Sequence, residues 1–283
     1  MIALVDTRPY LRPERLSEFV LREDGPWLVR RDGLVQAAPG DPVLGAEWAE
    51  KQAKFIGWTQ DAAMFAKDEV ERNYAIYDGW FRADPGRRLT GRLLDIGGGW
   101  GLFREWWDED ESGCYVVHDP GVERFTVAPP ETLRRRFARG LARPALFVEG
   151  VGEDLPYREA SYDTVCVISA LDHCARPAGV LAEAHRVLAP GGRLFAVQGF
   201  EPEPGERLLR RGIVRRVARV LTDPRRLYRA LRTRLRHGGD PHLHHFTRSG
   251  LRALIADAGY VDVRESVLDE RFAVAVVEAR KPR

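Results

Sequence analysis

The sequence predicts an α/β protein built on a doubly wound, mostly parallel sheet of about seven strands. Two observations support this fold class. Between residues 92 and 200, short apolar runs alternate with helical patterns, which is typical of a buried parallel sheet with helices on both faces. In addition, a glycine-rich turn at residues 97–101 follows the first of these runs, where sheets of this kind bind ligands.

Length and composition narrow the class of protein. The chain has 283 residues, 44% of them hydrophobic and 30% charged, with a formal net charge of +2. This balance is ordinary for a globular protein and argues against a polycation that coats nucleic acid. Cys114, Cys166 and Cys174 form no CxxC pair, which disfavours a zinc or disulfide framework. With no signal-peptide core and no apolar run of about 18 residues, we expect a soluble, cytoplasmic protein.

Residues 1–90 are expected to form an N-terminal β/helical extension. Up to residue 45, short apolar pieces are separated by turn signals at Asp24-Gly25-Pro26 and Asp32-Gly33, a pattern typical of short strands. Residues 46–82 lack proline and carry apolar side chains at roughly helical spacing, so they are predicted to form helices. Asp84-Pro85-Gly86 closes this region.

Residues 91–200 are expected to form the core of the fold, and residues 246–283 to complete it. Apolar runs predict parallel strands at 93–98, 114–119, 145–150, 164–171 and 193–200, and helical patterns occupy 102–110, 129–141 and 178–188. Thr247 is predicted to cap a helix that ends near Gly259. Runs at 261–267 and 271–279 then predict an antiparallel hairpin at the edge of the sheet.

Residues 201–245 are expected to form an arginine-rich helical lid inserted between the fifth strand and the last helix. Twelve arginines and one acid, Asp223, lie between Arg207 and Arg236, beside an apolar stripe at helical spacing. Three interpretations of this segment remain open. It is a solvated face over a packed stripe, a contact for an anionic substrate or membrane surface, or a site for RNA.

The glycine turn carries the most specific signal for a ligand. Asp95, Gly97, Gly99 and Gly101 stand in the register DxGxGxG after the first core strand. Glycines at such a turn let the backbone approach a ligand closely, and the following helix start offers backbone N–H groups. A dinucleotide-binding GxGxxG motif does not fit, because its third glycine would fall on a leucine or an arginine.

With this motif the chain resembles the class I S-adenosylmethionine-dependent methyltransferases, in particular the bacterial group that acts on small molecules, sugars and lipids. Four further pieces stand in the family's order. They are Asp119 at the end of the second strand, residues 149–165, SALDHCARP at 169–177 and RVLAPGGRLF at 186–195. The resemblance implies a Rossmann-like fold over residues 92–200 plus the C-terminal helix and hairpin, with S-adenosylmethionine as the cofactor.

The resemblance also implies where the cofactor binds. The glycine turn would pass under the methionine part, and Asp119 would accept hydrogen bonds from both ribose hydroxyls. In the loop near adenine the family often has an acid where this chain has Val151, so Glu153 or a backbone group would replace it. An aromatic residue upstream, Tyr74, would close over the cofactor or simply pack between helices. The implied cofactor-binding residues are Asp95, Gly97, Gly98, Gly99, Gly101, Asp119, Pro120, Gly152, Glu153, Ser169, Leu171 and Tyr74.

Methyl transfer to a hydroxyl or an amine requires a group that removes a proton. His173, beside Asp172 after the fourth strand, is the candidate base, because ligands bind at that end of the sheet and imidazole titrates near neutrality. A capping or packing role for His173 remains open. His245, in the HLHH segment 242–245, is a second candidate, with a structural lead-in to the last helix as the alternative. No cysteine or acidic ligand pattern stands near this segment, so no metal site is predicted.

The leading function is S-adenosylmethionine-dependent methyl transfer to a small-molecule, sugar or lipid-linked acceptor, at O or N rather than C. An anionic acceptor, or a peripheral membrane contact through residues 207–236, would suit the arginine-rich segment. DNA is not an expected partner. Two alternatives remain: a methyltransferase-like binding protein without catalysis, and an RNA methyltransferase that uses the basic lid, whose RNA binding would depend on salt.

Overall fold

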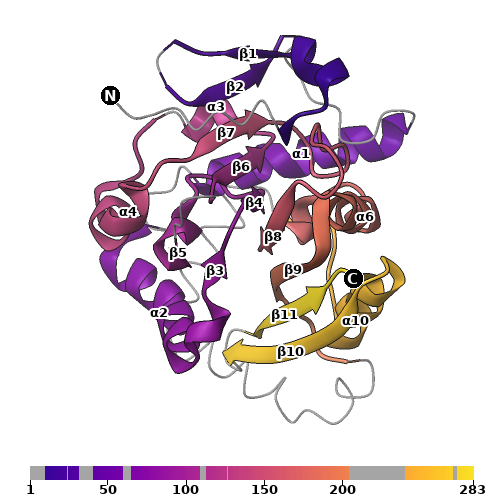
Figure 1. The fold of residues 1–283 in the computed structure, drawn as a ribbon. Coiled ribbons are helices and arrows are strands. Elements are labelled where there is room, and N and C mark those ends of the chain that lie inside the picture. The colour runs from indigo at the N-terminus through magenta and orange to yellow at the C-terminus, as the bar shows by residue number, and fades with distance from the viewer. Residues whose placement is uncertain are drawn as a thin grey trace.

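The structure, a computed structural model, describes residues 10–23, 25–31, 41–59, 65–108, 113–125, 127–203, 240–269 and 273–283. These residues form a central sheet with helices on both sides of it (Figure 1). The sheet has nine strands in the order β1-β2-β7-β6-β4-β8-β9-β11-β10. The arginine-rich segment 207–236, predicted to be a helical lid, lies outside the described residues.

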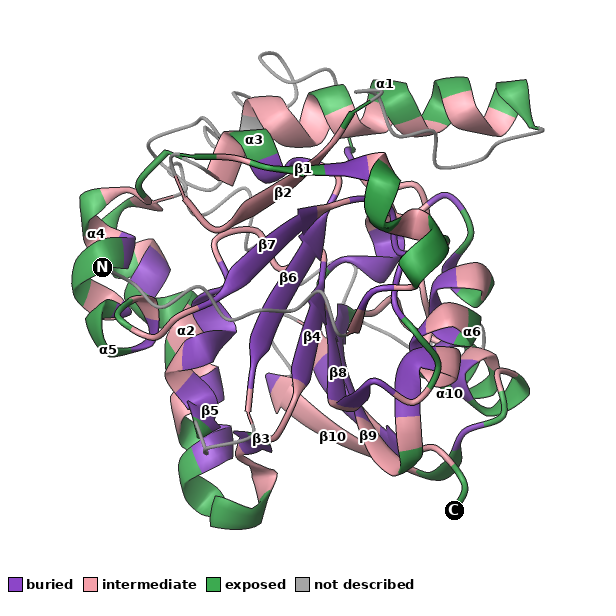
Figure 2. Cartoon of the chain, turned by 45° about the horizontal axis from the view of Figure 1, so that its top comes forward, coloured by how far each residue is buried: buried purple, intermediate pink, exposed green. Residues whose placement is uncertain are grey.

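Five parallel strands form the centre of this sheet. They are β4 (Leu93–Ile96), β6 (Tyr115–Asp119), β7 (Leu146–Glu149), β8 (Tyr162–Ile168) and β9 (Leu188–Gly199). Every residue of β4 and β6 is buried (Figure 2). Strands that are covered on both faces must be apolar, and this is why they stand out in the sequence as apolar runs. Strand β4 pairs with β6 on one side and β8 on the other, so the strand order reverses beside β4.

Two antiparallel hairpins extend the sheet at its edges. The C-terminal hairpin of β10 (Val261–Asp269) and β11 (Val274–Arg280) joins β9 through antiparallel pairing of β11, as the sequence predicts. The N-terminal hairpin of β1 (Phe19–Leu21) and β2 (Trp27–Arg30) joins the other edge, where β2 runs parallel to β7. The sheet therefore has nine strands instead of about seven, because two strands of the N-terminal extension pair with it.

Helices cover both faces, which confirms the doubly wound arrangement. Helix α2 (Lys67–Ala83) and α4 (Glu131–Arg136) lie on one side of the strands, and α6 (Pro177–Val187) and α10 (Arg248–Asp257) lie on the other (Figure 1). The 3-10 helix η5 (Leu102–Trp106) and α5 (Ala138–Leu141) pack on the side of α2. Two core clusters follow from this. One packs Val70, Tyr77 and Phe81 of α2 on the sheet, and the other packs residues of α6 and α10 on the opposite face.

Local sequence signals explain most helix ends but not all. Thr247 caps α10 as predicted, because its hydroxyl accepts a hydrogen bond from the Gly250 amide at 3.1 Å. Gly259, just after α10, has a φ of 90°, a conformation that glycine adopts most readily. The helix predicted over 102–110 is instead η5 followed by the two-residue strand β5 (Trp107–Asp108). The helix predicted over 129–141 breaks into α4 and α5 at Phe137.

The remaining elements are short, except for one long helix at the surface. Helix α1 (Pro42–Thr59) contains no buried residue among those whose burial is described, and it lies beyond the carboxyl ends of the central strands (Figure 2). The short elements are η2 (Pro13–Glu18), η4 (Pro85–Arg87), β3 (Leu89–Thr90), α3 (Val122–Phe125) and η6 (Leu171–His173). Strand β3 pairs with β5 in a small second sheet.

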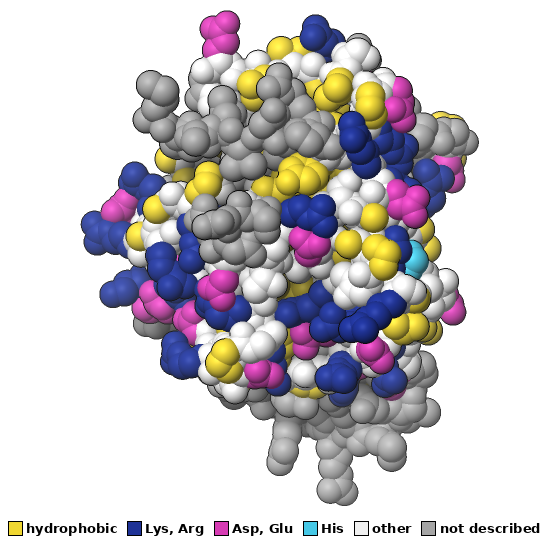
Figure 3. Space-filling view, in the orientation of Figure 1, with side chains coloured by type: hydrophobic (Ala, Val, Ile, Leu, Met, Phe, Trp, Pro, Cys, Tyr) yellow, Lys and Arg dark blue, Asp and Glu magenta, His cyan; other side chains and the backbone are white. Residues whose placement is uncertain are grey.

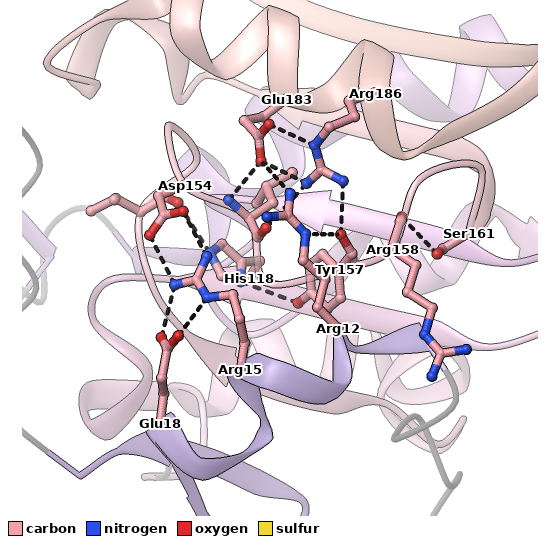
Figure 4. A network of polar contacts seen from close by, with 12 residues as sticks. Arg12, Arg15, Glu18, His118, Asp154, Tyr157, Arg158, Ser161, Glu183 and Arg186 are labelled. Atoms are coloured by element: carbon pink, nitrogen blue, oxygen red, sulfur yellow. Dashed lines mark hydrogen bonds and ion pairs between the residues drawn. The ribbon is translucent and has the colours of Figure 1, made fainter.

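The segment before β1 is fastened to the loop that follows β7. Leu11 bridges Tyr157, and the Arg15 guanidinium donates hydrogen bonds to both Asp154, at 2.6 and 2.9 Å, and Glu18, at 2.6 and 2.8 Å (Figure 4). These contacts lower the pKa of Glu18, mainly through the hydrogen bond from Arg15. The N-terminal extension therefore restrains residues 151–158, whose first part lines the pocket described below.

The described surface carries both signs of charge. On the face shown in Figure 3, Lys and Arg side chains are interleaved with Asp and Glu. Within the described ranges, none of the helices has the length and apolar character that a membrane span requires.

Candidate cofactor and acceptor site

A pocket lies where the carboxyl ends of four strands meet, beside the reversal of strand order at β4. The empty space within it is about 590 Å³, including space open to solvent. It is lined by residues that follow β4, β6, β7 and β8 and by one face of α1. The predicted site residues that line it are Gly97, Asp119, Pro120, Gly152, Glu153, Ser169 and His173.

Gly97 is the residue of the glycine turn that lines this pocket. Gly98, Gly99 and Gly101, also predicted to bind the cofactor, are not among its lining residues. Gly97 and Gly99 have φ angles of 70° and 55°, and Gly101, at 66°, leads into η5. Few residues other than glycine adopt these angles at low cost. A Cβ atom on Gly97 would lie 2.6 Å from the Cβ of Ala170, so only a bare backbone leaves room there. The turn is thus a cradle that a side chain would fill.

Asp119, at the end of β6, is 8% exposed and faces the same pocket. Its carboxylate accepts hydrogen bonds from the Gly99 amide at 3.2 Å and the Gly121 amide at 2.7 Å. Burial, the largest cause, raises its pKa, and these two bonds oppose the rise. Each carboxylate oxygen can accept more than one bond, so Asp119 still has acceptor capacity for hydroxyl groups in the pocket.

Asp95 lies beneath the glycine turn and does not line the pocket. It is 1% exposed, its Oδ2 accepts a hydrogen bond from the Tyr115 hydroxyl at 2.5 Å, and a Cβ on Gly98 would lie 2.4 Å from that oxygen. Burial raises the pKa of Asp95 to about 7. This buried position suits a role for Asp95 in supporting the glycine turn. Tyr115 was not anticipated from the sequence.

The end of β8 differs from the prediction at one residue. Ser169 has a φ of 49°, unusual for a residue with a side chain, and lines the pocket. Leu171, predicted to face the same space, is instead fully buried in the core, and Ala170 takes the place beside Gly97. The left-handed turn at Ser169 changes which side chains point into the pocket, so a simple alternation along the strand fails here.

Tyr74 is not brought to the pocket. Its ring packs edge-on against Phe137 at 4.7 Å and lies beside Tyr77, and burial raises its pKa to about 12. Tyr74 therefore packs between helices, which is the second of the two roles expected for it from the sequence. The aromatic wall comes instead from α1, through Trp48 and Phe55 with Gln52 between them. Their spacing over residues 48, 52 and 55 is that of one helix face, a signal present in the sequence.

His118 also lines the pocket and was missed. It sits on β6 and is 1% exposed, with Nδ1 3.1 Å from the Tyr157 hydroxyl and Nε2 3.2 Å from the carbonyl of Val151 (Figure 4). Burial lowers its pKa to about 4, so the imidazole is neutral at neutral pH. With both ring nitrogens engaged, His118 holds the 151–157 loop and is poorly placed to accept a proton from a substrate.

The two predicted histidines occupy different places. His173 lines the pocket, and its ring lies tilted against Phe55 at a centroid distance of 4.4 Å. Its backbone carbonyl accepts a hydrogen bond from the Gln52 side-chain amide at 3.2 Å. Burial, the largest cause, lowers the pKa of His173, and the nearby carboxylate of Asp172 opposes this. Asp172 is buried beside it, 3.8 Å from the His173 Nε2. His245 does not line the pocket; its side chain is 49% exposed and lies 3.1 Å from Asp240.

Comparison with known proteins agrees with this geometry. The profile of a family described as "Methyltransferase domain" matches residues 94–196. A ubiquinone/menaquinone biosynthesis C-methyltransferase from Acidiphilium cryptum is 33% identical over 121 residues, 41% of this chain and 44% of that protein. One of the same name from Dinoroseobacter shibae is 26% identical over 202 residues, 68% of this chain and 74% of that protein. The chain thus spans about half the length of several relatives it matches.

Solved structures of low sequence identity align with most of the chain. A protein from Pyrococcus horikoshii is 15% identical, with a TM-score of 0.46, and the alignment covers 76% of this chain and 92% of that one. The CurJ carbon methyltransferase is 16% identical, with a TM-score of 0.46, over 70% of this chain and 50% of that one.

The switch-point pocket, its bare glycine wall and its buried carboxylate define a cofactor-binding α/β domain suited to an adenosyl group. The sequence match identifies the domain more closely: residues 94–196 form a class I S-adenosylmethionine-dependent methyltransferase domain. The pocket fits that cofactor, because Gly97 leaves a cradle that a side chain would fill and Asp119 offers a carboxylate beside it.

Proposed function

We propose that the chain transfers the methyl group of S-adenosylmethionine to a small-molecule, sugar or lipid-linked acceptor bound at the His173 side of the pocket. The observation that carries this proposal is the position of Gly97, Asp119 and His173 around one cavity. Gly97 and the Asp119 carboxylate suit the cofactor, and the His173 imidazole, which can accept a proton, lines the same cavity.

The cofactor would lie along the strand ends. Its methionine part would run over Gly97, its ribose hydroxyls would donate to Asp119, and its adenine would lie near Pro120 and Gly152, all of which line the pocket. Glu153 also lines the pocket, but its Oε1 accepts a hydrogen bond from the Arg176 amide at 3.0 Å. This bond indicates that Glu153 helps to hold the loop at the start of α6.

The protein's contribution to the reaction is alignment, exclusion of water and handling of one proton. When bound, the cofactor supplies an electrophilic methyl group on sulfur. The α1 face and the strand ends would hold the acceptor in line with that group, and such positioning contributes about 7–11 kcal/mol in well-oriented systems. His173 and Asp172 are the candidate catalytic residues at the acceptor, with His245 farther out at the exposed end of the same cluster.

The acceptor atom is proposed to be O or N, because an imidazole faces the pocket and can take the O–H or N–H proton of such an acceptor. Carbon is the second candidate, favoured by the printed names of the similar proteins from Acidiphilium and Dinoroseobacter. Incubation with methyl-labelled S-adenosylmethionine and separate panels of phenols, sugars, amines and quinone precursors distinguishes them by the position of the label in the product.

Asp119→Ala is expected to weaken S-adenosylmethionine binding by at least about tenfold, since hydrogen bonds to a charged group contribute roughly 1.5–3 kcal/mol. Calorimetric titration of the wild type and the variant measures this, with thermal unfolding as a check that the variant is folded. Asp108→Ala is the matched control, because Asp108 pairs with Arg88 at the surface and lies outside the pocket. Equal affinities of the wild type and Asp119→Ala would remove the ribose role.

A further inference from the structure

At the edge of the pocket, three side chains from two distant segments converge on one point. Asp172 and His173 belong to η6, and His242 belongs to the loop before α10. One ligand atom from each lies within 4.8 Å of the other two. The backbone fixes this arrangement, because the carbonyl of Asp172 accepts hydrogen bonds from the amides of Leu243 at 2.7 Å and His244 at 3.0 Å.

The spacing of these groups is wider than direct hydrogen bonding requires. The Asp172 carboxylate lies 3.8 Å from the His173 Nε2 and 3.5 Å from the His242 Nε2. Hydrogen bonds of this kind measure about 2.7–3.2 Å. Ligand atoms that share one ion at bonds of about 2.0–2.2 Å lie roughly 3–4 Å apart, so small side-chain rotations would bring all three to one ion.

A buried carboxylate oxygen of Asp172 is a second observation that points to a bound cation. Asp172 is 8% exposed, and its Oδ1 has no hydrogen-bond partner among the described residues. Leaving a buried charged group unsatisfied in this way costs free energy. A cation at the point of convergence would satisfy it.

The surroundings of His242 are those of a metal-binding histidine. Its Nδ1 lies 2.5 Å from the Asp240 carboxylate, which directs Nε2 toward Asp172. A carboxylate on the second ring nitrogen is the usual support for a histidine ligand, since it fixes the ring and raises its basicity. Asp172 and Asp240 together also supply two negative charges, the number that neutralises a divalent ion.

We infer that Asp172, His173 and His242 bind one divalent transition-metal ion, such as Zn²⁺, at the acceptor side of the pocket. Two imidazoles and one carboxylate suit zinc and its first-row neighbours, and three protein ligands leave coordination positions open for a substrate. The sequence did not predict this site, because the HLHH segment has no acidic ligand pattern beside it and only the fold brings Asp172 there.

The role of the ion rests on the proposed methyl transfer. An acceptor hydroxyl bound to the ion would lose its proton to water, since coordination lowers the pKa of a bound O–H group. The oxygen would then attack the methyl carbon of S-adenosylmethionine. The new C–O bond forms as the C–S bond breaks, and the electron pair of that bond stays on sulfur. The cluster would thus select oxygen acceptors, and His173 would act as a ligand and not as a lone base.

Titration of metal-free, untagged protein with Zn²⁺, in competition with a chromogenic indicator, tests the site without any acceptor. One ion per chain is expected, with a Kd on the order of 1 µM or tighter. His242→Asn and Asp172→Asn should each weaken binding at least about 100-fold, and Asp240→Asn about 10–100-fold. His185→Asn is the matched control, because it removes an imidazole that packs on Tyr260 far along α6.

The outcomes separate this inference from the proposed function. Absence of Zn²⁺ binding, or equal binding by the wild type and His242→Asn, overturns the metal site. The same samples are titrated with S-adenosylmethionine, which reports the cofactor pocket and shows that each variant is folded. Retained cofactor binding without Zn²⁺ binding contradicts only the ion, whereas Zn²⁺ binding without cofactor binding contradicts only the methyltransferase proposal.

Discussion

Gly97→Ala is expected to weaken S-adenosylmethionine binding by at least about 100-fold, because the added methyl group would strain the backbone of the turn and occupy space at the pocket wall. Gly97 has a φ of 70°, and the added Cβ would lie 2.6 Å from the Cβ of Ala170, another pocket residue. Either the turn after β4 or the start of η6 must move, and each movement displaces a wall of the cavity. Calorimetric titration with the cofactor measures the effect.

A second glycine provides the control for this experiment. Gly79 lies on the exposed side of α2, and a Cβ there meets nothing within 4 Å. Gly79→Ala should therefore keep its affinity for the cofactor and gain about 1 kcal/mol of stability from the better helix former. If folded Gly97→Ala binds the cofactor as well as the wild type does, the backbone at residue 97 does not pass beneath it.

His173→Asn is expected to lower turnover by about 10²–10⁴-fold. This is the range for losing a general base, or a ligand of the metal ion that activates the acceptor. The affinity for S-adenosylmethionine should change by less than about threefold, because the cofactor contacts proposed here lie at the strand ends and not at His173. Turnover is followed as formation of the demethylated cofactor with whichever acceptor of the panel supports the fastest reaction of the wild type.

This split between turnover and cofactor affinity separates catalysis from packing. The ring of His173 packs against Phe55 of α1, so with a purely structural role its loss would loosen the pocket and weaken cofactor binding along with turnover. His185→Asn, outside the pocket, should leave both unchanged. A wild-type turnover number for His173→Asn would end its catalytic role and, with it, the role assigned to the ion.

Much of the fold could be predicted because its signals are local. Buried parallel strands are continuous apolar runs, so β4, β6, β7 and β8 were recognised within a few residues of their bounds. The Thr247 cap likewise depends only on neighbouring residues. Pairing of β2 with β7 depends on contacts between segments far apart in the sequence, and this is why two extra strands were not expected in the main sheet.

In the candidate site, too, the residues predicted correctly are those whose position depends on local sequence signals. Gly97 and Asp119 could be placed because each follows a strand whose end lies at a known edge of the sheet. The sequence analysis named Tyr74 and not the aromatic residues of α1, since both helices carry aromatic residues and only packing decides which helix crosses the pocket. The approach of His242 to Asp172 is still less visible, because a loop near the C-terminal helix has to dock on η6.

We propose that the ends of β4, β6, β7 and β8 hold an adenosyl cofactor. A crystal structure of the protein with the demethylated cofactor, S-adenosylhomocysteine, measures this most directly. We expect ribose hydroxyls within hydrogen-bonding distance of Asp119, the homocysteine chain over Gly97 and the sulfur facing Ser169. Electron density for the adenosyl group at another place, or a carboxylate of Asp119 turned away from the ribose, would contradict it.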